Sequence, residues 1–287
     1  MWLSDLAFVS DTLKHTENAH GGGESSSWML HHISDSKTID LEPFGHITLP
    51  QFPPIHIGGM EIDLSITKHV FFMWLVSLIL IIVLAIVARS YRKQVVPHGL
   101  ANLIEVFVVF IRDEIVLSVI GKEGLRYLHY FLTLFFFILL CNLFGLIPYG
   151  ATATGNLAVT GGLAFLSFIL IQLAGIKKHG LIGYYKGLVP HGVPAFVAPV
   201  MFIVEFLGLF AKAFALTVRL FANMTAGHIV ILSLIGLIFV FKSVLVAPIS
   251  IAFAIFINLL EILVAFIQAY IFTMLTALFV GLSIHQH

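Results

Sequence analysis

The chain has 287 residues, 59% of them hydrophobic and only 10% charged. Soluble domains carry about 25% charged residues, so this composition predicts a membrane protein whose solvent is largely lipid. The formal net charge is zero, which excludes the overall positive field with which many proteins attract nucleic acid. Cys141 is the only cysteine, so the chain can form neither an internal disulfide nor a cysteine-based metal site.

Residues 1–69 are predicted to form a polar arm outside the membrane. Nine of the 15 acidic residues and only three of the 15 basic residues lie here. Glycine and serine runs between positions 21 and 27, and a proline-rich stretch from 43 to 54, indicate an exposed, partly ordered segment. Histidine-rich tracts can bind metals, but His31 and His32 are the only adjacent pair here, so we expect solvated surface and no metal site. The first residues carry acids where a signal peptide requires bases, so no signal is predicted.

Residues 70–287 are predicted to form the membrane domain. Residues 70–88 are an uncharged run of nineteen, which is enough for one membrane-spanning helix. Residues 97–128 mix charged and apolar side chains, which predicts an amphipathic helix lying in the membrane interface. The alternative for that segment is an ordinary helix packed on protein.

The segment 129–176 is predicted to be a hairpin of two membrane helices. It contains no charged residue, and the stretch "PYGATATGN" from Pro148 to Asn156 divides it with a tight connection. Basic residues follow the first span and the third span, whereas the arm is acidic. The positive-inside rule therefore predicts that the arm lies outside the cytoplasm.

Two long apolar runs fill residues 195–284, with one polar break from Lys242 to Pro248. A helix of about forty residues would be about 60 Å long at 1.5 Å per residue, which is about twice the thickness of the hydrocarbon core. We expect a long tilted hairpin rather than four shorter spans. The predicted fold is thus an all-α membrane protein with five to six membrane helices and an interfacial amphipathic helix.

Polar residues on the first long helix follow one stripe. Glu205, Lys212 and Arg219 recur every seven positions, and Asn223 follows four residues later, so these side chains fall within about 40° of one another. His228 lies on the opposite side of the helix. An arginine at the bilayer centre costs about 2.5–3.5 kcal/mol, so a functional role for Arg219 is favoured over a purely structural one.

Polar residues of the second long helix match those of the first. A hairpin with its turn near Val244 places Arg219 at the depth of Gln268 and His228 at the depth of Glu261. The amides could simply hydrogen-bond between helices, and the histidine and carboxylate could be a static pair. A fixed cation close to a histidine, which exchanges protons at physiological pH, instead indicates proton or ion movement.

The stretches "LTVRLFANMTAGH" and "EILVAFIQAYIFTMLTALFV" closely resemble subunit a of the F-type ATP synthase, and "NLIEVFVVFIRDEI" and "FGLIPYGATATGN" extend the resemblance over most of residues 70–287. In that family the arginine matching Arg219 separates two aqueous half-channels and makes each arriving carboxylate of the c-ring release its proton. Asn223 and Gln268 match polar residues near that arginine. His228 and Glu261 match a pair that lines the half-channel opposite the catalytic head, and Glu205 matches a polar residue on the cytoplasmic route.

The resemblance implies a non-catalytic subunit that translocates protons and couples their flow to ring rotation, with ATP synthesis on partner subunits and no cofactor. Implied partners are the c-ring, the peripheral-stalk b subunits, the remaining ATP synthase subunits and membrane lipid, in a bacterial inner membrane. Asn142 and Asn156 stand where some relatives have acids, so no role in proton uptake is assigned to them. The alternative is a proton-coupled secondary transporter, which predicts an internal repeat; the polar stripe has no counterpart in residues 70–190.

Overall fold

The computed structural model describes residues 36, 38–40, 46–51, 55–57, 60–62, 65–93, 98–147, 150, 152–188, 196–241 and 247–285. The glycine and serine runs, the His31-His32 pair and the predicted turn near Val244 lie outside these residues. In the arm, β1 (Thr38–Asp40) pairs antiparallel with β2 (His46–Thr48), and β3 (Ile55–Ile57) pairs with β4 (Met60–Ile62). These strands were not predicted, because three residues are too few for a recognisable alternation of apolar and polar side chains.

Five helical segments in the described part of the chain are long and apolar enough to cross a membrane. They involve α3 (Lys68–Lys93), α5 (Leu128–Gly145) with the preceding 3-10 helix η2 (Lys122–Tyr127), α6 (Leu157–Lys186), α7 (Ala198–Phe241) and α8 (Ala247–Ile284). The prediction of an all-α membrane fold is confirmed, and the chain is a multi-pass integral membrane protein.

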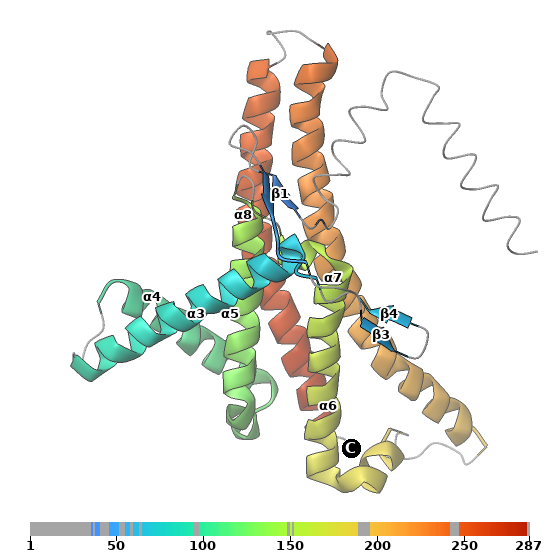
Figure 1. The fold of residues 1–287 in the computed structure, drawn as a ribbon. Helices are drawn as coiled ribbons and strands as arrows, with labels where there is room; N and C mark the ends of the chain where they lie inside the picture. The colour runs from blue at the N-terminus through green and yellow to red at the C-terminus, as the bar shows by residue number, and fades with distance from the viewer. Residues whose placement is uncertain are drawn as a thin grey trace, which may run out of the picture.

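Helices α7 and α8 form the long hairpin that the sequence predicted, and they have 44 and 38 residues. Each begins with a proline in its first turn, Pro199 and Pro248, where a missing backbone N–H costs nothing. The two helices run side by side near their connection and separate toward their other ends, where α6 packs against both (Figure 1). At 1.5 Å per residue α7 is about 66 Å long, so it must cross a hydrocarbon core of about 30 Å at a tilt or project beyond it.

The core of the bundle lies where α5, α6 and the second half of α8 meet. Phe131, Ile138 and Phe272 are almost completely buried there. Small residues on α8, such as Ala265 and Ala269, are also fully buried and let neighbouring helices approach closely. The first half of α8 is largely exposed by contrast, so the upper part of the hairpin in Figure 1 projects from the bundle.

The segment between α3 and α5 is amphipathic but is not one continuous helix. It consists of α4 (Leu100–Phe110) and the π-helix η1 (Ile111–Leu117), and Gly121, with a φ of 82°, separates η1 from η2. Ile111 and Ile115 are completely buried against the bundle, whereas Arg112 is exposed. The inner face of η1 is therefore covered by protein, whereas apolar residues of α4 such as Leu103 and Val106 are exposed, as an amphipathic helix in the membrane interface requires.

Helix α6 bends near its end at Gly180, whose φ of 74° lies in the left-handed region that favours glycine. The bend returns the last turn against the helix, so the Tyr184 ring packs on Gly175 and is only 1% exposed. A Cβ at Gly175 would overlap that ring. The 3-10 helix η3 (Ala153–Gly155) lies in the short connection between α5 and α6.

Candidate functional site

The amide groups predicted on the two long helices meet in the structure. Asn223 on α7 donates from Nδ2 to Oε1 of Gln268 on α8 over 2.9 Å, and Gln268 is 2% exposed. The sequence placed Gln268 at the depth of Arg219, but its partner lies one helical turn further along α7. The same stripe continues toward the start of α7, where Glu205 is partly buried and Lys212 Nζ lies 5.3 Å from the ring centroid of Phe279.

Arg219 lies on the outside of the bundle. Its side chain is exposed and makes no hydrogen bond or ion pair with any residue that the structure describes. Leu216, Leu220 and Met224, on the other side of α7, are buried. The exposed side around Arg219, here called the outer face of α7, also carries four small side chains: Ala211, Ala215, Ala222 and Ala226.

His228 points away from this outer face and contacts the connection between α5 and α6. Its Nε2 lies 2.9 Å from the carbonyl oxygen of Gly145 and 2.7 Å from Oγ1 of Thr152. Because a carbonyl can only accept, Nε2 carries the hydrogen of the neutral ring. The lone pair therefore sits on Nδ1, on the side of α8.

Glu261 of α8 completes this second group. Its Oε1 lies 3.9 Å from Nδ1 of His228, which is longer than a hydrogen bond. Nδ1 of His228 and Oε2 of Glu261 are both buried and have no hydrogen-bond partner among the described residues. The structure thus brings the two positions together, as the hairpin geometry predicted, without a direct hydrogen bond between them.

Gly227 makes room for the carboxyl group, a role that the sequence did not reveal. Helix α7 continues through this glycine without a break. A Cβ at Gly227 would overlap the Glu261 side chain. Gly145 and Thr152 were also missed as histidine partners, because a connection predicted only as a tight turn does not show which backbone carbonyl faces another helix.

Asn142 and Asn156 hold the α5–α6 connection in place. Asn142 is completely buried; its Oδ1 accepts from Oγ1 of Thr154 over 2.5 Å, and its Nδ2 donates to the carbonyl of Ala265 over 3.5 Å. Asn156 caps α6 by accepting from the backbone N–H of Ala158 over 2.8 Å. These bonds tie the connection to α8 and thereby position the groups that contact His228.

Substituting Gly227 by alanine is expected to separate the histidine and the carboxyl group, because the new methyl group occupies the space of the Glu261 side chain. Alanine is intrinsically favoured over glycine in a helix, but here the buried carboxyl group must move away from the added methyl group, so this variant should unfold at a lower temperature than a variant with alanine at an unhindered glycine of the same helix. Gly208→Ala is the matched control, since Gly208 lies on the same helix with nothing within 4 Å of an added Cβ. Equal melting of the two variants would contradict the proposed packing.

Fold and site together define a multi-pass membrane protein with titratable and amide side chains gathered on its two longest helices. The family model of the ATP synthase A chain matches residues 70–281. The chain is 52% identical over 258 residues to ATP synthase subunit a of Chloroherpeton thalassium, a match that covers 89% of this chain and 76% of the relative. It is also 52% identical over 231 residues to ATP synthase subunit a of Myxococcus xanthus, covering 79% of this chain and 76% of that one. The chain therefore belongs to the ATP synthase A chain family.

Proposed function

We propose that this chain is the ion-conducting stator subunit in the membrane sector of an F-type ATP synthase, where it forms two half-channels at the interface with the c-ring. It contributes no catalytic group to ATP synthesis, which takes place on partner subunits. The observation that carries this proposal is Arg219, a charged side chain within a membrane-spanning helix, exposed and without a partner among the residues that the structure describes.

An unpaired guanidinium in the membrane needs an opposite charge from outside the chain. The small side chains on the outer face of α7 allow another helix to approach closely. A carboxylate on a ring helix is the matching group. Next to Arg219 its ionised form is favoured by about ten- to a thousandfold, so it releases its proton on arrival. The guanidinium itself cannot lose a proton, and Arg219 therefore also separates the two half-channels.

The remaining polar residues lie on either side of Arg219 along α7. Glu205 and His228 are about 35 Å apart at 1.5 Å per residue, comparable with the hydrocarbon core of about 30 Å. Glu205 thus serves the cytoplasmic half-channel, and the pair of His228 and Glu261 serves the half-channel on the side of the N-terminal arm. The amides of Asn223 and Gln268 bind water next to the arginine. We place the chain in a bacterial inner membrane with its arm outside the cytoplasm, because basic residues lie at the C-terminal ends of α3 and α6.

A proton-coupled secondary transporter is a weaker alternative. Such transporters bind their substrate between internal repeats near the middle of the membrane. Here the unpaired cation faces outward, and the polar stripe of α7 has no counterpart in the preceding helices.

The peripheral-stalk b subunits and the other ATP synthase subunits complete the assembly that we propose.

Cysteine cross-linking tests whether the outer face of α7 meets the ring. In a Cys141→Ala background, Ala222→Cys is expected to form a disulfide with a cysteine placed next to the ring carboxylate, because Ala222 is exposed beside Arg219. Leu220→Cys is the control, since Leu220 is completely buried within the bundle. Cross-linking at Leu220 but not at Ala222 would contradict the proposed interface.

A further inference from the structure

A pocket of about 420 Å³ lies away from the proposed ion path, where η2 leads into α5 and where α6 and α8 end. Its volume falls within the range of about 300–1,000 Å³ that is usual for small-ligand sites. Three helix ends meet here at one edge of the membrane domain, because a predicted span begins at Lys122 and two others end at Lys186 and Ile284. The pocket is therefore level with the lipid headgroups.

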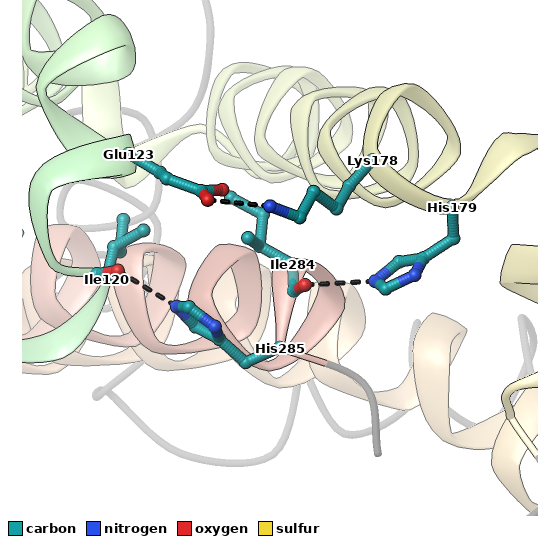
Figure 2. Close-up of polar contacts among 6 residues, drawn as sticks. All are labelled: Ile120, Glu123, Lys178, His179, Ile284 and His285. Carbon is teal, nitrogen blue, oxygen red and sulfur yellow. Dashed lines mark hydrogen bonds and ion pairs between the residues drawn. The ribbon is translucent and has the colours of Figure 1, made fainter.

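The rim of the pocket is strongly basic. Four cations line it, Lys122, Arg126, Lys177 and Lys178, together with one acid, Glu123. Lys178 Nζ lies 2.6 Å from Oε1 of Glu123 (Figure 2), so this pair is neutral overall. The other three cations are exposed and have no ion pair or hydrogen bond with any described residue. The pocket consequently has a surplus of three positive charges.

The floor of the pocket is apolar. Ala174 and Ile284 are 1% and 4% exposed, and the half-buried ring of Tyr127 adds to the lining. A free anion gains nothing from such a floor. A molecule with a charged head and an apolar body matches both parts of the pocket.

Two histidines hold the walls of the pocket together (Figure 2). Nε2 of His179 on α6 donates to the carbonyl of Ile284 over 2.9 Å, and Nε2 of His285 donates to the carbonyl of Ile120 over 3.0 Å. The bonds fasten the end of α8 to α6 on one side and to the segment before η2 on the other. The pocket is thus formed before any ligand arrives, which lowers the entropic cost of binding.

We propose that this pocket binds the phosphate group of an anionic phospholipid, with Lys122, Arg126 and Lys177 contacting the phosphate and the apolar floor covering the adjoining glycerol and acyl carbons. Basic pockets between membrane helices bind acidic headgroups in this way. Inorganic phosphate shares the charged chemistry, but the apolar floor and the level of the pocket favour the lipid. The site is independent of the residues proposed to conduct ions.

The test uses the assembled ATP synthase in phosphatidylcholine vesicles that contain a photoactivatable phosphatidylglycerol. Cross-linked peptides from η2 and from the end of α6 are quantified by mass spectrometry. The double variant Lys122→Gln/Arg126→Gln is expected to label these peptides about thirtyfold less than the wild type, from about 1 kcal/mol per basic residue. The control Arg89→Gln/Lys186→Gln removes two exposed cations that do not line the pocket, and its labelling should be unchanged.

Competition identifies the source of the phosphate without any variant. Unlabelled phosphatidylglycerol should displace the probe, whereas phosphatidylcholine and inorganic phosphate should not. Equal labelling of wild type and the pocket variant, or an equal loss in the control, would overturn the proposal. Displacement by inorganic phosphate alone would overturn its lipid part. Because the experiment measures lipid cross-linking and not ion transport, a negative result would not bear on the proposed ion path.

Discussion

Replacing Arg219 by alanine is expected to lower ATP-driven proton uptake by vesicles that contain the assembled enzyme by about ten- to a thousandfold, while passive proton leak increases. Without the guanidinium, the ionised form of a ring carboxylate loses a stabilisation of about ten- to a thousandfold. The ring then carries its protons past α7 instead of releasing them, so coupled uptake should fall by a comparable factor. The leak increases because the fixed charge no longer separates the two half-channels.

Two further variants distinguish charge from structure. Arg219→Lys keeps the cation but loses the planar group that binds a carboxylate with two parallel hydrogen bonds, so it should retain part of the uptake. Lys212→Gln removes a cation of the same stripe that lies over the Phe279 ring, and it should leave the coupling intact. If Arg219→Ala pumped protons at the wild-type rate in a correctly assembled complex, Arg219 would have only a structural role.

The long hairpin was predictable because its signal is physical and local. Apolar runs of this length exceed what one perpendicular span needs, and prolines mark both helix starts. The meeting of His228 with Glu261 was predictable from the same geometry, since residues at equal depth in a hairpin lie next to each other. Both expectations follow from the rise per residue of an α-helix and from the position of one hairpin turn.

Other parts of the site depend on how three helices meet, which no single helix encodes. The contact of Nε2 of His228 with Gly145 and Thr152 crosses from α7 to the α5–α6 connection. Likewise, the space above Gly227 matters only because Glu261 of α8 occupies it. The partner of Gln268 was misplaced by one turn of α7, because a turn position inferred from a few polar residues does not fix the offset of two tilted helices.

The histidine and the carboxyl group on the side of the arm give the second large expected effect. His228→Gln and Glu261→Gln should each lower ATP-driven proton uptake by about a hundredfold, the low end of what a positioned acid or base contributes. Each change leaves a polar side chain of similar size in place and removes one of the two groups that exchange the proton. Asn258→Ala is the control, since Asn258 lies one turn from Glu261 and has no hydrogen bond within the described part of the chain.

Exchanging the two residues tests whether their chemistry or their order matters. The double variant His228→Glu/Glu261→His should recover much of the uptake lost by either single variant, because a histidine still faces a carboxyl group. Recovery should be incomplete, since the carbonyl of Gly145 can only accept and a carboxyl group at position 228 satisfies it only while protonated. Complex abundance and ATP hydrolysis, measured in parallel, separate lost conduction from lost assembly. A double variant as inactive as the single ones in an intact complex would show that the individual positions, rather than proton exchange between them, set the rate.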